Sequence, residues 1–477
     1  MLDLLPADIL YKILVHLPVD DLVRLEQVSK TLHNITQHRA IWSDAYEIST
    51  LPRPPGPFAW QSSTQLRSIL ETSARVDRNW PPHEESRFSV RNIQLGDHWY
   101  NTFNLVFGRW LFAATPKTVR LFDLDDKLVQ GQKIYSVGDS ESATMSSFRC
   151  VDIVTPEGRR AFAVCVQRAE INFVIKVFTI TFEDERPVSF ETILEIPTEL
   201  LTLDRVDISP KGLIIRGPGL VADRHKHIWI MDIQTYQLYT LSTPPIEGRR
   251  SWHIIGMCVG NTHLFLVHSP PVPSASWRTY VEAFPLEPQE DGELHISHRS
   301  DCPDVMPLGT WRICDSGNVT FLGVEGTRCV LAEFSLSLTS PAENGVAPID
   351  CIVSTVTGFP PASRRGMELR FQSTSAGDSE RSRRILMIGP SISEHSLQPR
   401  LTGLKVTEDR SSDAFAEMGR GGGGIALATR RVPVNGARFG AQGVIGFDEA
   451  KGRVWLQAAT STATSNEERF IQVIDFR

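Results

Sequence analysis

The 477-residue chain has no long apolar run, no excess of basic residues and no paired cysteine motif. No stretch reaches the roughly 18 to 20 apolar residues that a membrane-spanning helix needs, and charges interrupt the aliphatic N-terminal stretch, unlike a signal peptide. The net charge is −7, so no overall positive field attracts nucleic acid. The seven cysteines are scattered, with no C-x-x-C pair for zinc or redox work. These absences predict a cytoplasmic or nuclear protein that binds neither membranes nor nucleic acid.

Motifs of catalysis and metal binding are missing too. The sequence has no Gly-x-Ser-x-Gly nucleophile turn and no His-Glu-x-x-His metal helix. The glycine run at 419–424 is followed by Ile425 instead of the Gly-Lys-Ser/Thr ending of a phosphate-binding loop, so we interpret it as a flexible loop. His225 and His227 alternate as two ligands on a strand face do, but no third ligand stands near them in sequence. The sequence therefore predicts no metal, no cofactor and no catalytic activity.

Three short amphipathic helices are predicted between Leu5 and Trp42. Pro6 suits the first position of a helix, Pro18 ends that helix, and Asp20 or Asp21 can cap the next one. Apolar residues recur at helical spacing: Ile9, Leu10, Ile13, Leu14 and Leu17 in the first helix, Leu22, Val23, Leu25 and Val28 in the second, and Leu32 and Ile35 in the third. About forty residues cannot bury so many aliphatic side chains alone, so these faces pack either on the rest of the chain or on a partner.

The order and spacing of these residues resemble an F-box. The matching elements are Leu5-Pro6-Ala7-Asp8-Ile9, Ile13-Leu14, Leu17-Pro18, Asp21-Leu22, Val28-Ser29-Lys30 and Trp42. The chain departs from the family pattern at Asp8, Ser29 and Leu32, where the family usually has Glu, often Cys and commonly an aromatic residue. The resemblance implies a three-helix module that binds the small adaptor of a cullin-RING (SCF-type) ubiquitin ligase. It implies adaptor contacts for nine residues: Leu5, Pro6, Ile9, Ile13, Leu14, Leu17, Leu22, Leu25 and Val28.

A connector rich in proline and serine is predicted between residues 47 and 85. Within it, residues 61–76 are compatible with a helix that braces the F-box against the following domain. Three tryptophans are candidate anchors of that brace: Trp42, Trp60 and Trp80. The segment 75–80 is similar to the one that leads into the large domain in many fungal F-box proteins. We therefore predict three parts, an F-box at 1–46, a linker with a helix at 47–85 and a large domain at 86–477.

The large domain is predicted to be almost entirely β, because from Phe88 onward short runs rich in β-branched and aromatic residues lie between turn residues. Six of these runs form a loose repeat: Val119–Asp123, Ile175–Thr179, Ile228–Asp232, Tyr280–Phe284, Val330–Phe334 and Ile471–Asp475. The first five follow one another at intervals of about fifty residues, a period typical of β-propeller blades. The Phe-Asp and Met-Asp endings resemble those of WD-type repeats, although no Gly-His precedes them. The last run ends almost at the C-terminus, which suits a strand that completes a blade begun elsewhere.

The predicted fold is thus an α+β multidomain protein, a three-helix F-box followed by a large all-β domain that we predict to be a seven-bladed β-propeller. Six to eight blades are compatible with the spacing, and a pair of β-sandwiches is the alternative architecture. The predicted function is the substrate-recruiting subunit of a cullin-RING ubiquitin ligase, with an unknown protein substrate on the propeller. Two alternatives stay open, an F-box-tethered scaffold without a role in degradation and a propeller hydrolase or lyase.

Arginines are the candidate substrate-binding residues of the large domain. Arg216 and Arg312 lie within or beside predicted strands, where an arginine needs a partner or a channel to face. The segment 363–384 holds six arginines and three carboxylates, a composition that can bind an acidic or phosphorylated partner. A solvated loop is the alternative interpretation of this segment, because serine, glycine and threonine are frequent in it.

Overall fold

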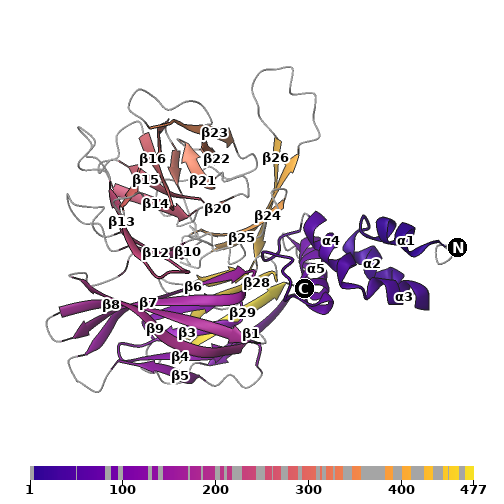
Figure 1. Ribbon diagram of the computed structural model, residues 1–477, viewed down its shortest axis with the longest axis horizontal. Coiled ribbons are helices and arrows are strands. Elements are labelled where there is room, and N and C mark those ends of the chain that lie inside the picture. The colour runs from indigo at the N-terminus through magenta and orange to yellow at the C-terminus, as the bar shows by residue number, and fades with distance from the viewer. Residues whose placement is uncertain are drawn as a thin grey trace.

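The structure of the protein is a computed structural model. It describes residues 5–49, 51–80, 88–94, 100–126, 131–137, 143–169, 172–183, 186–198, 203, 205–208, 212–216, 228–242, 253–259, 262–269, 278–287, 293–303, 305–307, 312–313, 319–325, 328–336, 346–355, 382–389, 400–409, 424–432, 444–448, 451–460 and 468–476. Five helices come first and an all-β domain follows, and Figure 1 shows the helices on one side of the strands.

The helices are α1 (Ala7–Leu14), α2 (Val19–Leu25), α3 (Lys30–Thr36), α4 (Arg39–Ile48) and α5 (Ser63–Asn79). The three predicted F-box helices and the predicted linker helix are all present, and α4 is an addition. Pro6 and Pro18 stand at the N-cap positions of α1 and α2, without a side-chain hydrogen bond. The predicted cap by Asp20 or Asp21 is therefore wrong. Both carboxylates lie in the first turn of α2, where they face the positive end of the helix dipole.

Helix α5 completes the core of the helical module, which we define as residues 5–80. The buried side chains of this core come from α1, α2, α4 and α5: Leu14, Val19, Leu22, Ile41, Trp42, Ala45, Tyr46, Leu66, Leu70 and Ala74. The Trp42 indole N–H donates to the Thr36 carbonyl at 2.7 Å, which satisfies the polar group of the largest buried side chain. The linker thus supplies apolar surface that the first three helices lack.

A capping box starts α5. The Ser62 hydroxyl accepts the Gln65 N–H at 3.2 Å, and the Gln65 side chain accepts the Ser62 N–H at 2.9 Å. These two bonds satisfy backbone donors that no helical carbonyl reaches.

Ser62→Ala is expected to lower the free energy of unfolding of the helical module by about 1 kcal/mol, because one cap bond is lost. Chemical denaturation of the full chain, followed by helical circular dichroism, measures this loss. Thr64→Ala is the control, since neither bond of the box involves the Thr64 side chain. Equal stability of the Ser62→Ala variant and the wild type would show that the box contributes nothing.

The described strands form seven sheets, which equals the predicted number of blades. Sheet I contains β2 (Thr102–Val106), β3 (Trp110–Ala114), β4 (Thr118–Asp123) and β5 (Gln132–Ser136). Sheet II contains β6 (Thr144–Thr155), β7 (Gly158–Ala169), β8 (Asn172–Glu183) and β9 (Arg186–Thr198). Sheet III contains β10 (Arg205–Ile208), β11 (Gly212–Arg216), β12 (Ile228–Asp232), β13 (Leu238–Ser242) and β17 (Glu293–His295).

The other four sheets follow in chain order. Sheet IV contains β14 (His253–Val259), β15 (His263–Ser269), β16 (Arg278–Pro285) and β18 (His298–Pro303). Sheet V contains β19 (Val305–Pro307), β20 (Arg312–Ile313), β21 (Val319–Glu325), β22 (Arg328–Leu336) and β23 (Ile349–Thr355). Sheet VI contains β24 (Ser382–Gly389), β25 (Arg400–Asp409) and β26 (Gly424–Val432). Sheet VII contains β1 (Phe88–Gln94), β27 (Val444–Asp448), β28 (Arg453–Thr460) and β29 (Glu468–Phe476).

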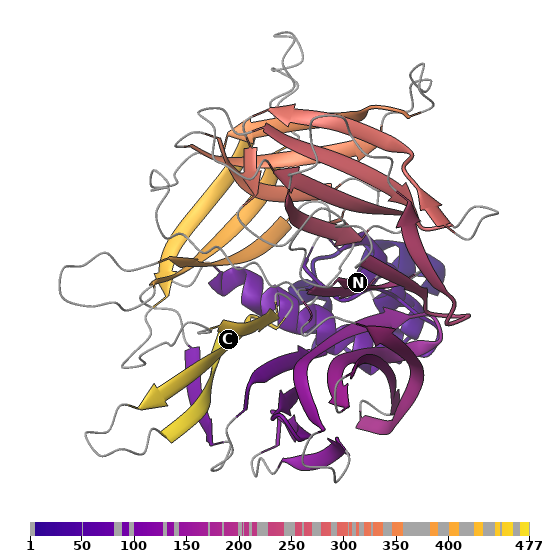
Figure 2. The ribbon, with the colours of Figure 1, turned by 90° about the vertical axis from the view of Figure 1, so that its left-hand side faces the viewer.

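The sheets are arranged about a common centre, as Figure 2 shows. Strand β2 contacts β6 and β27, β10 contacts β6 and β14, and β14 contacts β20. Hydrophobic clusters fill the spaces between sheets I and II, II and III, III and IV, IV and V, and VII and I. Each sheet in these pairs buries a face against its neighbour in chain order, so the fold is propeller-like.

The six predicted repeats lie in equivalent strands. They fall on β4, β8, β12, β16, β22 and β29, each of which is the third strand along its sheet when the sheet is followed outward from the centre. Each repeat therefore marks the equivalent strand of a different sheet. Among the described residues, sheet VI lies between the fifth and sixth repeats.

The two ends of the β-domain meet in sheet VII. Strand β1 pairs antiparallel with β29, from Phe88 opposite Phe476 to Gln94 opposite Phe470. The predicted role of the C-terminal strand is confirmed, since sheet VII takes one strand from the start of the β-domain and three from its end.

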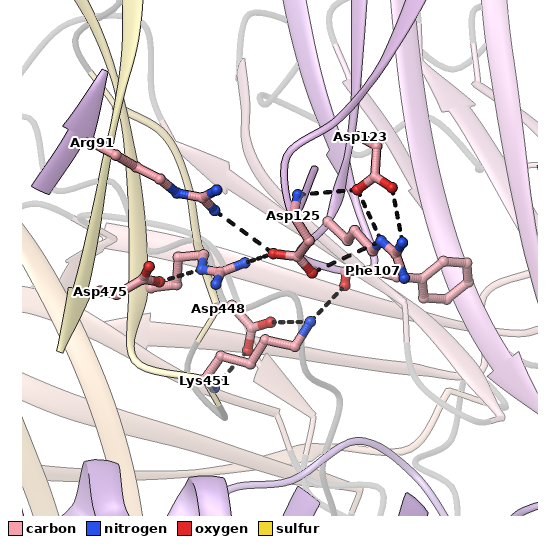
Figure 3. A network of polar contacts seen from close by, with 9 residues as sticks. Arg91, Phe107, Asp123, Asp125, Asp448, Lys451 and Asp475 are labelled. Atoms are coloured by element: carbon pink, nitrogen blue, oxygen red, sulfur yellow. Dashed lines mark hydrogen bonds and ion pairs between the residues drawn. The ribbon is translucent and has the colours of Figure 1, made fainter. Parts of the chain in front are cut away.

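A network of ion pairs joins sheet VII to sheet I (Figure 3). Arg453 pairs with Asp475 in sheet VII and, at 2.6 Å, with Asp125 after β4. Arg109 forms two hydrogen bonds with Asp123, at 2.8 and 2.9 Å, and lies 3.8 Å from Asp125. Burial opposes ionisation of Asp123, but the hydrogen bonds from Arg109 and from the Asp125 N–H, together with the charges of Arg109 and Arg186, lower the pKa of this carboxyl. The network thus links the sheet that closes the ring to the next one.

Asp125→Asn is expected to lower the free energy of unfolding of the β-domain by about 0.5 to 1 kcal/mol, because Asp125 is 38% exposed and water screens its pairs. The loss should shrink at 1 M salt. Denaturant titrations at low and high salt measure both effects, with Glu191→Gln on β9 as an exposed control. A loss of the same size in both variants would contradict a specific role of Asp125.

Candidate protein-binding surface

The helical module exposes apolar side chains on and near α1. Ile9 is 47% exposed, Ile13 38% and Leu5 37%. Ile9 and Ile13 lie four residues apart and therefore share one face of α1. Pro6 is exposed as well. We call Leu5, Pro6, Ile9 and Ile13 the α1 surface, and Figure 1 shows α1 at the end of the molecule away from the β-domain.

Exposed apolar residues are concentrated in this module. Within the described part of the chain, eight large apolar side chains are exposed, and five of them lie in the first 48 residues: Leu5, Ile9, Ile13, Val28 and Ile48. Exposed apolar side chains that gather on one part of a soluble protein mark sites of protein contact. The α1 surface is thus the candidate binding site, and Val28, 68% exposed, is a further candidate.

The nine residues predicted to contact the adaptor fall into three groups. Five are exposed, namely Leu5, Pro6, Ile9, Ile13 and Val28. Leu17 and Leu25 are partly buried against the helical core. Leu14 and Leu22 are core residues, 1% and 0% exposed. Adaptor contact stays a prediction for all nine, and the exposed five can make it without any change in the core.

Helix α1 is held in place by a polar contact as well as by the core. The Tyr11 hydroxyl on α1 donates to the Asp44 carboxylate on α4. This hydrogen bond and burial raise the pKa of Tyr11 to about 12, so the hydroxyl keeps its proton at neutral pH. Helix α1, which carries the α1 surface, is therefore held in place both by the helical core and by the Tyr11–Asp44 hydrogen bond.

Ion pairs fix α5 on α2. Arg67 contacts Glu26 at 2.7 Å and Glu71 at 2.5 Å, and Arg78 contacts Asp20 at 2.9 Å. The Arg67 guanidinium also lies over the Trp42 ring, 5.6 Å from its centroid. Helix α5 is therefore an integral part of the module that presents the α1 surface.

The predicted brace also contacts the β-domain through two of its three tryptophans. The Trp60 indole N–H donates to the Thr155 carbonyl of sheet II at 3.1 Å. The Trp80 ring stacks on Phe447 of sheet VII with 5.2 Å between centroids. Trp42, the third candidate anchor, lies in the helical core instead. The residues just before and just after α5 thus contact sheets II and VII, the two sheets that flank sheet I.

A cluster of charged groups surrounds the β2–β3 turn next to Trp60. Asp152 of β6 accepts the Phe107 N–H at 2.7 Å. As a residue Asp152 is partly exposed, but protein atoms surround its carboxyl, which is the group that titrates. Burial of the carboxyl and the nearby Asp448 raise the pKa of Asp152 to about 7, against the Phe107 hydrogen bond and Arg159. Asp152 therefore changes charge near neutral pH.

Sequence reasoning missed this cluster. Its members come from three sheets, and no short motif connects Phe107, Asp152 and Arg159. Asp448 ends the strand segment Gly446-Phe447-Asp448, which has the same Phe-Asp ending as the repeat at Asp123. That ending is the sequence feature that could have pointed to Asp448 as a member of the cluster.

The two arginines proposed for substrate binding lie on different sheets. Arg216 ends β11 in sheet III and is partly buried, and Arg312 starts β20 in sheet V. The structure describes the strand position of Arg312 but not its side chain. A role of either residue in substrate binding stays a prediction.

Several other sequence candidates lie outside the described residues. They are His225 and His227, the glycine run up to 423, and residues 363–381 of the arginine-rich segment. In the part of the chain that the structure does describe, no three His, Cys, Asp or Glu side chains are grouped as metal ligands. None of the described helices has the length and apolar character needed to cross a membrane.

Comparison with known proteins identifies the helical module. Residues 2–47 match the family model F-box-like, so the chain carries an F-box-like domain at its N-terminus. The predicted F-box is thereby confirmed, whereas its fungal type and the WD-like character of the repeats stay predictions. No curated protein matches the chain in sequence.

Solved structures resemble the chain only distantly. The tricorn protease is 10% identical, with a TM-score of 0.41 over 81% of this chain and 35% of its own. Drosophila Plexin A, in complex with Semaphorin 1b, is 8% identical, with a TM-score of 0.38 over 82% and 88%. An oligogalacturonate lyase in complex with manganese is 9% identical, with a TM-score of 0.35 over 62% and 73%. This chain spans about a third of the length of the tricorn protease.

Proposed function

We propose that this protein is the substrate-recruiting subunit of a cullin-RING (SCF-type) ubiquitin ligase. The helical module binds the adaptor of the ligase, and the β-domain captures a protein substrate. The chain itself performs no catalysis in this proposal. The observation that carries it is the F-box-like match at residues 2–47, which supports a role as an F-box adaptor.

The exposed apolar row on α1 supports the adaptor contact in physical terms. Protein interfaces are stabilised mainly by a few apolar anchors near their centre. The α1 surface offers such anchors on a helix that the Tyr11–Asp44 contact and the helical core hold in place. No rearrangement of the module is then needed before the adaptor binds, which keeps the cost of association low.

We further propose the division into an F-box at 1–46, a linker at 47–85 and a propeller at 86–477. The packing of α5 on α2 and α4 supports one rigid body that contains the F-box and most of the linker. Arg216 and Arg312 remain the proposed substrate contacts. The proposed location is the cytoplasm or the nucleus, where cullin-RING ligases act.

Affinity purification of the full chain from its native cell, with and without a proteasome inhibitor, tests this function. The adaptor and a cullin should co-purify in both samples. Substrates should become more abundant when the proteasome is inhibited. Partners whose amounts do not change would favour a scaffold without a role in degradation, and the absence of adaptor and cullin from both samples would contradict the proposal.

A further inference from the structure

The β2–β3 turn lies at the junction of the helical module and three sheets of the β-domain. Phe107 and Gly108 in this turn have φ angles of 50° and 60°, in the left-handed region. A Cβ atom on Gly108 would lie 2.1 Å from the Asp448 carboxylate, so this carboxylate packs directly on the glycine. Only glycine fits that position of the turn.

Two carboxylates from different sheets flank this one turn. Asp152 of sheet II accepts the Phe107 N–H, and Asp448 of sheet VII packs on Gly108. Lys451 of sheet VII also binds the turn, where its ammonium donates to the Phe107 carbonyl at 3.4 Å and lies 3.9 Å from Asp448. The turn is thus held by charged groups from both neighbouring sheets.

The same turn is connected to the helical module through Arg159. The Arg159 guanidinium lies 5.5 Å from the centroid of the Phe107 ring and 5.9 Å from that of the Trp60 ring. Trp60 in turn donates to Thr155 and stacks on Phe58, at 6.1 Å between centroids. A continuous path of contacts therefore runs from the Asp152 carboxyl through Phe107 and Arg159 to the segment that precedes α5.

We propose that the β2–β3 turn is a proton-sensitive latch, which holds the helical module on the β-domain more tightly when Asp152 is protonated. The charged and titratable groups around Asp152 are Asp448, Arg159, Lys451 and, on the same strand, Cys150. Burial of the Asp152 carboxyl and the nearby Asp448 carboxyl both oppose the ionised form of Asp152. The latch does not depend on the proposed ligase function, because it concerns contacts within this chain.

The direction of the effect follows from linkage. The pKa of about 7 in the closed latch lies above the value of about 3.9 for an aspartate in water. Stabilisation by the protonated carboxyl is complete below about pH 4 and is lost as the pH rises to about 7. Where opening returns the carboxyl to water, the opening constant rises by about tenfold per pH unit in that range and levels off above it.

Amide hydrogen exchange of the full chain between pH 5 and pH 8 tests the latch, with rates corrected for the intrinsic pH dependence of exchange. In the wild type, the opening constant of amides in residues 58–62 and 105–109 should rise by up to about a hundredfold from pH 5 to pH 7. Asp152→Asn should show nearly the same low opening constant at every pH. Glu191→Gln, which changes an exposed carboxylate in the same sheet, should behave like the wild type.

A wild type without this slope, or an Asp152→Asn variant that keeps it, would overturn the proposal. Asp448→Asn provides a second test of the proposal, which can be made even if the Asp152→Asn variant does not fold. Removal of the negative neighbour should shift the end of the rise to lower pH. A rise that ends at the same pH as in the wild type would also overturn the proposal.

Discussion

Leu14→Ala is expected to lower the free energy of unfolding of the helical module by about 2 to 5 kcal/mol. Leu14 is 1% exposed and belongs to the core that α1 shares with α2, α4 and α5. Its removal leaves a cavity beside large rigid side chains such as Trp42 and Tyr46, which cannot collapse into it completely. Denaturant unfolding of the full chain, followed by helical circular dichroism, gives the size of the loss.

Ile13→Ala is the matched control, because Ile13 is the preceding residue on the same helix and is 38% exposed. Its replacement should change the stability by no more than about 0.5 kcal/mol. The β-domain should keep its own unfolding transition in both variants. Equal destabilisation by the two substitutions would contradict the burial pattern of α1.

The amphipathic pattern of α1 predicted a helix but not which apolar residues face the module's own core. Ile13 and Leu14 are adjacent in sequence, and both fit the apolar stripe. Successive helical residues point about 100° apart, so a stripe of five apolar side chains covers both an inward and an outward direction. Packing against α4 and α5 determines which side chain points inward, because these helices bury Leu14 and leave Ile13 exposed.

The sheets of the β-domain could be predicted from the sequence where one strand of the sheet carries a similar run of residues. The strands β4, β8, β12, β16, β22 and β29 carry similar runs of five residues, so they recur visibly in the sequence. Sheet VI, with β24 to β26, kept no such ending.

The contacts between the helical module and the β-domain were only partly predictable. Trp60 and Trp80 stood out as large aromatic residues in a connector rich in proline and serine, and both contact the β-domain. Asp152 and Arg159 did not stand out, because single charged residues in a strand pattern are common on blade edges. Only the turn at Phe107, which is distant in sequence, gives them a shared environment.

The double variant Ile9→Ala with Ile13→Ala is expected to weaken adaptor binding by about 2 to 5 kcal/mol, or roughly one and a half to three and a half orders of magnitude in Kd. Both side chains are exposed and lie on one face of α1, so their truncation removes apolar contact area without opening a cavity. The variant thus separates binding from stability, which Leu14→Ala does not. Val188→Ala on β9, another exposed aliphatic side chain, is the control for surface truncation and should leave binding unchanged.

The central claim is that the α1 surface binds the adaptor of a cullin-RING ligase. The most direct measurement is a calorimetric titration of the purified adaptor into the full chain, for the wild type and the Ile9→Ala/Ile13→Ala variant, beside a thermal melt of each protein. The account predicts tight binding by the wild type, a loss of at least about thirtyfold in the variant, and the same melting temperature for both. Unchanged affinity in the variant, or a loss that appears only together with unfolding of the helical module, would contradict it.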